Sequence, residues 1–231
     1  MIPLRDANPS RGIPLVNYAL IGACAVVFVY ELTLERHLSI FLMQYGLVPM
    51  RYTRPEISAH FTLLEQMIPV FGSMFLHGGW LHLIGNMWTL YIFGDNVEGY
   101  LGSVRYFLFY VLSGTIAAAI QILTNPDSSI PTIGASGAVA GVMGAYFILY
   151  PQAKVLTFIP LFIFFYLTEI PAYVFLGFWF VLQFFNGTLS LSSRAQEFAG
   201  IAWWAHVGGF VGGIVLLGGF NAMARRSRRR R

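Results

Sequence analysis

Two residues of this sequence could act together as a nucleophile and a base. Ser136 lies in the string Gly134-Ala135-Ser136-Gly137, at the start of an apolar stretch that continues to Tyr150 without a charged residue. His206 lies further along the chain in Ala205-His206-Val207-Gly208-Gly209, inside a second apolar stretch. A serine hydroxyl is a weak nucleophile until a neighbouring base takes its proton. The pair therefore predicts nucleophilic catalysis at a site with little water.

Two further polar residues, His82 and Asn86, are one helical turn apart in another apolar stretch. Side chains with this spacing lie on the same face of a helix. Both can donate hydrogen bonds to a developing negative charge, as an oxyanion site requires. The structural alternative is a polar pair that links two membrane helices, and a lone Ser136 is likewise often only a packing residue.

The composition determines what kind of fold must position these residues. The chain has 231 residues, of which 57% are hydrophobic and only 10% are charged. Soluble domains contain about 25% charged residues, so this chain belongs to the class of polytopic membrane proteins. Its length allows about six membrane spans with short connections.

The apolar stretches predict an all-α polytopic membrane protein with six transmembrane helices. We expect a cytoplasmic segment at residues 1–12, the six-helix domain at 13–221 and a basic cytoplasmic tail at 222–231. The segment 155–170 is apolar but contains Pro160, and the pattern leaves open whether it is interfacial or spanning. The six predicted spans are 13–30, 70–93, 100–123, 134–150, 171–185 and 200–220.

The distribution of basic residues predicts the orientation of these spans. If both termini are cytoplasmic, ten of the fourteen Lys and Arg residues lie on the cytoplasmic side and four lie outside. This excess agrees with the positive-inside rule. The long connection 32–69 is then external, and its three prolines and many aromatic residues predict an ordered structure. The arginine-rich tail indicates contact with membrane lipid rather than with nucleic acid.

Small residues predict close contact between the fourth and sixth spans. Glycine and alanine let two helix backbones approach closely. The fourth span contains Gly137, Ala140, Gly141 and Gly144, and the sixth contains Gly200, Gly208, Gly209, Gly212 and Gly213. With a rise of about 1.5 Å per residue, Ser136, His206 and His82 fall within about one turn of a common depth. The fourth span is short, so Ser136 is expected below the outer surface of the membrane.

These motifs together resemble the rhomboid family of intramembrane serine proteases. Gly134-Ala135-Ser136-Gly137 is similar to its G-x-S-G, His82 and Asn86 to its H-x-x-x-N, and His206 with the following glycines to its A-H-x-x-G. Smaller similarities are Val48-Pro49-Met50-Arg51 and Glu98-Gly99-Tyr100-Leu101-Gly102. The resemblance covers essentially the whole chain, with the motifs in the expected order.

The resemblance implies a six-helix core and a Ser–His dyad that cleaves transmembrane segments of protein substrates. Ser136 would be the nucleophile and His206 the general base. His82, Asn86 and the backbone N–H of Ser136 would form the oxyanion site, with Gly134 and Gly137 as supporting residues. Some members carry a tyrosine four residues after the nucleophile to support the histidine. Ala140 stands there in this sequence, so the group that orients His206 is not predicted.

Other chemistries have weaker support in the sequence. Cys24 is the only cysteine, so no intrachain disulfide can form. The zinc protease motif H-E-x-x-H is missing, and we expect no metal or other cofactor. An inactive rhomboid-like binding protein and a small transporter remain as alternatives. We expect single-pass protein substrates and a bacterial plasma membrane, while the substrate's identity, the gating mechanism and the oligomeric state stay open.

Overall fold

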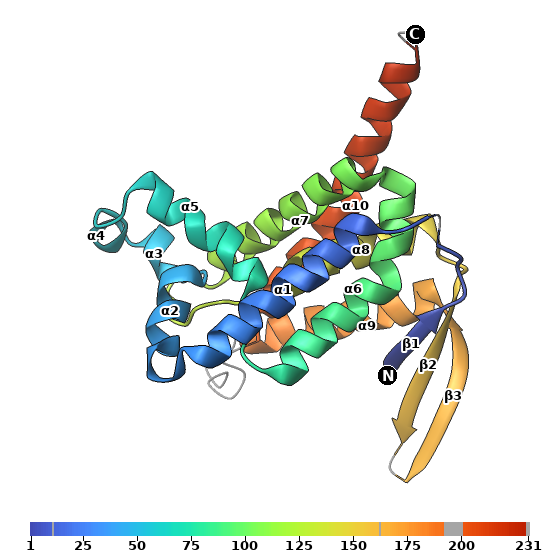
Figure 1. Cartoon of the computed structure of the whole chain (residues 1–231), viewed down its shortest axis with the longest axis horizontal. Helices are drawn as coiled ribbons and strands as arrows, with labels where there is room; N and C mark the ends of the chain where they lie inside the picture. Colours follow the sequence, from blue (N-terminus) through green and yellow to red (C-terminus); the bar gives the residue numbers. More distant parts are fainter. Residues whose placement is uncertain (11, 162, 192–200, 230–231) are drawn as a thin grey trace.

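The structure is a computed structural model that describes residues 1–10, 12–161, 163–191 and 201–229, with residues 224–229 described by their backbone only. Six long helices form a bundle, which confirms the predicted class of polytopic helical membrane protein (Figure 1). They are α1 (Leu15–Thr33), α6 (Trp80–Leu101), α7 (Ser103–Thr124), α8 (Ser136–Leu149), α9 (Ala172–Ser190) and α10 (Trp203–Arg229). The predicted tail 222–231 continues α10 as far as Arg229, and its last two residues lie outside the described part.

Not all six helices have the length of a membrane span. Within the described ranges, α1, α7, α9 and α10 are long and apolar enough to cross a membrane. The helix α6 passes the same criterion together with the helical segment before it, and α8 is a shorter apolar helix of 14 residues. A 14-residue helix rises only about 21 Å, less than the roughly 30 Å of a bilayer core. The prediction of a short fourth helix is confirmed.

The second predicted span, residues 70–93, is wrong as a single helix. The chain instead bends by 81° between Leu63–Phe75 and Trp80–Leu101. Three features explain the bend. Pro69 interrupts helical hydrogen bonding in the first part, and Gly79 has a φ of +157° just before α6 begins. Between them, the buried Glu31 carboxylate of α1 accepts two hydrogen bonds from the His77 N–H, both at 3.2 Å.

The connection between α1 and α6 is ordered, as its composition predicted. In Figure 1 its short helices form a lobe beside one end of the bundle. The Nη2 of Arg51 donates to the carbonyl oxygen of Glu65 at 2.7 Å, and its guanidinium lies 3.6 Å from the Phe61 ring centroid. The elements are η1 (Glu35–His37), α2 (Leu38–Tyr45), α3 (Met50–Thr53), α4 (Pro55–Ser58), α5 (Leu63–Gly72) and η2 (Ser73–Phe75).

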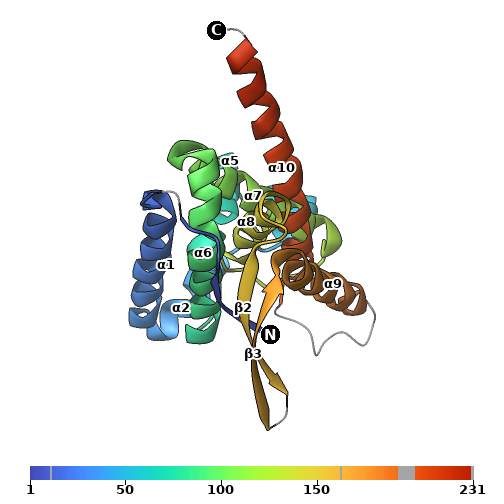
Figure 2. The ribbon, with the colours of Figure 1, turned by 90° about the vertical axis from the view of Figure 1, so that its right-hand side faces the viewer.

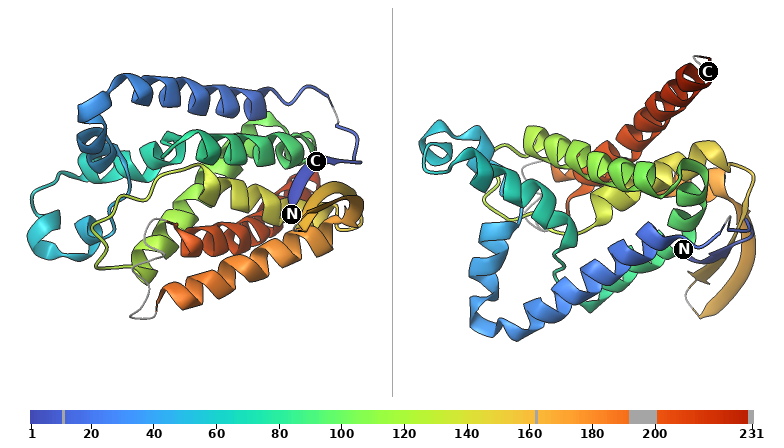
Figure 3. Two further views of the ribbon diagram at one scale, coloured as in Figure 1. Left: turned by 90° about the horizontal axis from the view of Figure 1, so that it is seen from below. Right: turned by 45° about the horizontal axis from the view of Figure 1, so that its top comes forward.

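The helix α8 occupies the centre of the bundle. Figure 3 shows α1, α6, α8, α10 and α9 side by side in that order, and α7 also packs against α8. Every residue of the run 137–146 is buried. The helix α8 has no polar face, and a helix that is apolar on all sides must be surrounded by other elements. Ser136, its first residue, therefore begins inside the protein and not on a membrane-facing surface.

Glycines bring α8 and α10 into backbone contact, as the sequence predicted. A Cβ added to Gly209 would collide with the carbonyl oxygen of Gly137, and one added to Gly213 would collide with that of Gly141. A Cβ at Gly144 would collide in turn with the carbonyl oxygen of Phe210. These backbones are too close for any side chain to fit between them. We call this contact the glycine seam.

A carboxylate from α6 caps the start of α1. The Glu98 side chain accepts hydrogen bonds from the backbone N–H groups of Val16 at 3.1 Å and Asn17 at 2.8 Å, and from the Ser103 hydroxyl at 2.6 Å. The first N–H groups of a helix have no partner within the helix, and negative charge is favourable there. Glu98 thus gives a structural role to the Glu98–Gly102 motif.

The segment 155–170, which the sequence left between interfacial and spanning, forms two antiparallel strands. They are β2 (Lys154–Leu161) and β3 (Phe164–Pro171), and they form a sheet with β1 (Ile2–Asp6) in the order β1-β2-β3. A side chain from α8 ties β1 to the bundle, because the Tyr146 hydroxyl donates to the Asp6 carboxylate at 2.5 Å. In Figure 1 the sheet lies at the end of the bundle where α1 and α9 begin, and Figure 2 views the molecule from that side. We call this end of the bundle the sheet end.

Candidate active site

The structure brings Ser136 and His206 into direct contact. The Nε2 of His206 lies 2.8 Å from the Oγ of Ser136, within hydrogen-bonding distance. Ser136 is the first residue of α8 and His206 is in the first turn of α10, so both lie at the end of the bundle opposite the sheet. The glycine seam fixes their separation, because it continues from Gly137 and Gly209, next to the two residues, along both helices.

The segment before α8 is anchored at two positions that precede Ser136. Thr132 pairs with Leu47 through two backbone hydrogen bonds of 2.8 and 2.9 Å, and the Gly134 N–H donates to the Ser73 carbonyl at 2.8 Å. Gly134 has a φ of +120°, which residues with a side chain rarely adopt. These contacts hold the serine at a sharp entry into the helix, where backbone N–H groups are free to bind an anion.

A glutamine on α9 contacts the other nitrogen of the His206 ring. The Nδ1 of His206 lies 2.7 Å from the Oε1 of Gln183, a side chain that is buried. An amide oxygen can only accept a hydrogen bond, so Nδ1 carries the ring proton and donates it. In the neutral ring Nε2 then has the lone pair, which faces the Ser136 hydroxyl. This is the tautomer that a general base requires.

Two tryptophans enclose the same ring. The ring centroid of Trp179 lies 5.9 Å from that of His206, and the centroid of Trp203 lies 6.3 Å from it. Ala140 is fully buried on the side of α8 that faces α10. A Cβ added to Gly209 would lie 3.3 Å from the Cβ of Ala140. With alanine at position 140, this position offers His206 neither an aromatic ring nor a polar group. Gln183 and the two tryptophans occupy the surroundings of His206 instead.

His82 and Asn86 both face Gly134. A Cβ added to Gly134 would lie 2.6 Å from the Nε2 of His82 and 3.6 Å from the Nδ2 of Asn86. The Asn86 side chain is buried, and its Nδ2 has no hydrogen-bond partner among the residues that the structure describes. A buried donor without a partner is costly and unusual in a native structure. The predicted pair is thus aimed at the space beside the serine, and one of its donors is unused.

The backbone before α6 selects the tautomer of His82. The Gly78 N–H donates to the Nδ1 of His82 at 3.4 Å. Since Nδ1 accepts this hydrogen bond, the proton of the neutral ring is on Nε2, the nitrogen that faces Gly134. His82 is therefore a hydrogen-bond donor toward the serine site. The bend between α5 and α6 provides this contact, because it places Gly78 over the first turn of α6.

A small cavity lies next to the serine. Its volume is about 30 Å³, and Ser136, Gly134 and Ala205 contribute to its lining. A space of this size can hold one or two water molecules, which need polar partners to remain there. The Ser136 hydroxyl is such a partner. The site therefore has room for the small molecule that a hydrolysis consumes.

Gln183 is the site residue that the sequence analysis missed. It is an uncharged but strongly polar residue inside the apolar stretch 171–185. The rule that singled out His82 and Asn86, that polar groups within membrane spans need a reason, applies equally to Gln183. What the sequence did not show was that α9 lies beside α10 at the depth of His206.

A bundle of apolar helices with a buried polar centre defines an integral membrane protein with a candidate hydrolytic site. A family model described as "Rhomboid domain" matches residues 64–220, well over half of the chain. The chain therefore belongs to the rhomboid family. Members of this family are generally intramembrane serine proteases that act on transmembrane protein substrates.

Individual relatives support the same family. The chain is 32% identical to Rhomboid protein 1, mitochondrial, of Saccharomyces cerevisiae over 62% of this chain and 38% of that protein. It is 39% identical to RHOMBOID-like protein 5 of Arabidopsis thaliana over 31% of this chain and 23% of that protein. It is also 34% identical to Rhomboid-like protease 5 of Toxoplasma gondii over 35% of this chain and 9% of that protein. The matches span well under half the length of each relative.

Proposed function

We propose that this protein is an intramembrane serine endopeptidase that uses Ser136 and His206 as a catalytic dyad. The observation that carries the proposal is the 2.8 Å contact between the Oγ of Ser136 and the Nε2 of His206. The contact joins a hydroxyl to the unprotonated nitrogen of an imidazole whose other nitrogen is occupied by Gln183. If Ser136 and His206 only packed two helices together, this tautomer would not be required.

The first half of the reaction forms an acyl-enzyme. The Ser136 oxygen attacks the carbonyl carbon of a substrate peptide bond, and its proton passes to the Nε2 of His206. The carbonyl oxygen becomes negatively charged and accepts hydrogen bonds from His82, Asn86 and the Ser136 N–H. When the intermediate collapses, the C–N bond breaks and His206 gives its proton to the leaving nitrogen.

The second half returns the enzyme to its starting state. A water molecule, for which the cavity beside Ser136 has room, gives a proton to His206 while its oxygen attacks the acyl carbon. The same three donors stabilise the second oxyanion. The bond between the acyl carbon and the serine oxygen then breaks, and Ser136 takes the proton back from His206. Gln183 holds the proton on Nδ1 through both halves, so that only Nε2 gains and loses a proton.

The substrates we propose are single-pass membrane proteins with small, helix-weakening residues near the cleaved bond. A peptide bond inside a helix is shielded by side chains and hydrogen-bonded to its neighbours, so the substrate must unwind locally to reach Ser136. The orientation we propose places both termini and the sheet end in the cytoplasm, in agreement with Arg5, Arg105 and Lys154. The serine then opens toward the opposite side of the membrane.

Labelling with a fluorophosphonate, which reacts with activated serines, tests the proposal. Wild type is compared with Ser136→Ala and His206→Ala in detergent, together with cleavage of a single-pass reporter in liposomes. Ser113→Ala and His60→Ala are matched controls, because Ser113 is a buried serine of α7 and His60 is exposed. Labelling and cleavage should disappear in the first two variants and persist in the controls.

Equal labelling of all five proteins would refute the dyad. Thermal unfolding of each variant shows whether a loss of labelling reflects misfolding instead. The two alternatives from the sequence, an inactive rhomboid-like binding protein and a small transporter, predict no reporter cleavage by wild type. No contact in the described residues favours either of them.

A further inference from the structure

The β2–β3 hairpin extends beyond any support from the helices. The strand β1 pairs only with the part of β2 from Val155 to Phe158, so the rest of the hairpin is two-stranded. Figure 1 shows β2 and β3 projecting together from the sheet end of the bundle and away from the helices. An isolated two-stranded hairpin is marginally stable in water. Something outside the described contacts must stabilise this end.

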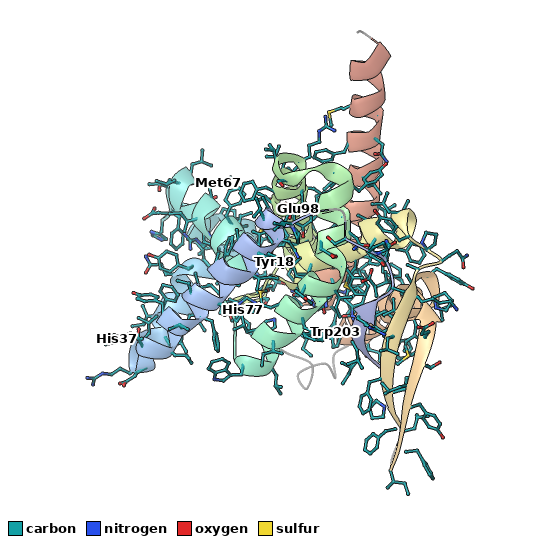
Figure 4. The ribbon with its side chains drawn as sticks, turned by 45° about the vertical axis from the view of Figure 1, so that its right-hand side comes forward. Tyr18, His37, Met67, His77, Glu98 and Trp203 are labelled. Carbon is teal, nitrogen blue, oxygen red and sulfur yellow. The ribbon has the colours of Figure 1, made fainter. Side chains whose placement is uncertain are left out.

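Both faces of the hairpin are apolar and exposed. Successive residues of a strand point to opposite faces, and a strand that meets water on one side normally alternates apolar with polar residues. Here Phe164 and Phe165 are adjacent and are 61% and 68% exposed. Figure 4 shows the side chains spreading around this part of the ribbon. The other large exposed residues are Leu161, Ile163, Tyr166 and Leu167.

Charge is confined to the base of the hairpin. Lys154 and Glu169 border a run of fourteen residues without a charged side chain. A continuous exposed apolar surface of this kind marks a site of protein or membrane contact. The chain passes from this surface into a helix long and apolar enough to cross a membrane, because β3 runs directly into α9. The residues Val174, Phe178 and Val181 of α9 are exposed apolar side chains of a membrane-spanning helix.

We propose that the β2–β3 hairpin inserts the strand ends near Leu161 and Phe164 into the phospholipid bilayer at the sheet end of the bundle. The bilayer covers both apolar faces, and Lys154 and Glu169 remain at the level of the lipid headgroups. This inference does not depend on the proposed protease activity.

The free edge of β3 sets the depth of insertion. Within the described part of the chain, the sheet order is β1-β2-β3, so no strand lies beside the backbone N–H and C=O groups along that edge. Such groups cannot lie in the hydrocarbon centre without a partner, because each would cost several kcal/mol there. The hairpin therefore occupies the interfacial layer, where water and headgroups supply partners and apolar side chains reach the acyl chains. Tyr166 is an aromatic residue suited to this layer.

Spin labels in liposomes test the inserted hairpin. Cys24 is the only cysteine, so Cys24→Ala gives a background for single labels at Phe164→Cys and Phe165→Cys, on opposite faces of the strand. Collision rates are measured with oxygen, which concentrates in lipid, and with a water-soluble nickel complex. Val181→Cys is the lipid reference, and Glu56→Cys, in the exposed loop helix α4, is the water reference.

If the hairpin is inserted, we expect the ratio of oxygen to nickel collision rates at both hairpin positions to shift from the ratio at the water reference, Glu56→Cys, toward the ratio at the lipid reference, Val181→Cys. A water-like ratio at either position overturns insertion. Low collision rates with both reagents also overturn it, since they show that protein covers the hairpin. The Val181 label, measured in parallel samples on the same Cys24→Ala background, shows that the background chain is inserted in the liposomes.

Discussion

Two of the interfaces that α10 makes near the site, those with α8 and with α9, differ in kind. Against α8 it uses backbone, because glycines bring Gly209 onto Gly137 and Gly213 onto Gly141. Against α9 it uses large rings, and the centroid of Phe210 lies 4.9 Å from that of Phe180 and 6.1 Å from that of Trp179. Side chains can change rotamer, whereas a backbone contact can change only if a helix moves.

This difference separates two functions of the site. Ser136 and His206, the two reacting groups, are joined across the rigid glycine seam. Gln183, which positions His206, comes from the side that is held by rings. The reacting atoms thus lie beside the glycine seam, which cannot adjust without a helix movement. The residue that positions His206 lies beside the ring contacts of α9, which can adjust by changes of rotamer. Substitutions on the two interfaces should therefore differ in size and in character.

The largest effect is expected from a single methyl group in the glycine seam. Gly209→Ala should lower the free energy of unfolding by about 2–3 kcal/mol and abolish activity, because its Cβ collides with a backbone oxygen. Gly218→Ala on the same helix meets open space and should be neutral or stabilising by up to about 1 kcal/mol. Thermal unfolding and reporter cleavage measure both. Equal stability of the two variants would show that the seam is not rigid.

A second substitution tests the oxyanion side without touching the seam. Gly134→Ala should reduce cleavage by about 10²–10³-fold, because its Cβ fills the space that His82 and Asn86 face. Gly102→Ala is the matched control, since Gly102 also has a positive φ, +79°, but no neighbour within 4 Å. Both variants are strained by about 1–2 kcal/mol. If both lose the same activity, backbone strain and not obstruction is responsible.

A smaller effect is expected on the α9 side. Gln183→Leu removes one hydrogen bond to His206 while keeping the side-chain volume, so kcat should fall by up to about tenfold with KM unchanged. Leu182→Ala, at a half-exposed neighbouring position of α9, should leave both constants near wild type. A rise in KM for Gln183→Leu would instead place this glutamine on the substrate's path.

The smallest effect is expected at the C-terminal end of α8, where the Tyr146 side chain contacts Asp6 of β1. Burial raises the pKa of the Asp6 carboxyl above 3.8, and the Tyr146 hydroxyl opposes this by donating to it. The folded state therefore binds a proton more tightly than the unfolded state. This contribution to stability is complete below pH 3.8 and declines as the pH rises through the folded pKa. Denaturant unfolding at several pH values should show the decline, and Asp6→Asn should remove it.

Much of the site followed from the sequence because its signals are local. Ser136, His206, His82 and Asn86 are polar residues in apolar stretches, and each can be identified without knowing its neighbours. The small residues of the fourth and sixth spans repeat at helical spacing, so their contact could also be predicted. These features depend on composition and on the period of a single helix.

The sequence by itself determined the class of protein, the short fourth helix and the residues of the candidate dyad. The tertiary structure alone decided the bend before α6, the strands of 154–171 and the approach of Gln183 to His206. The bend depends on Glu31, which is distant in sequence, and β2 depends on pairing with β1 from the other end of the chain. Hydrogen bonds of this kind join groups far apart in the chain, so no local period or propensity reveals them.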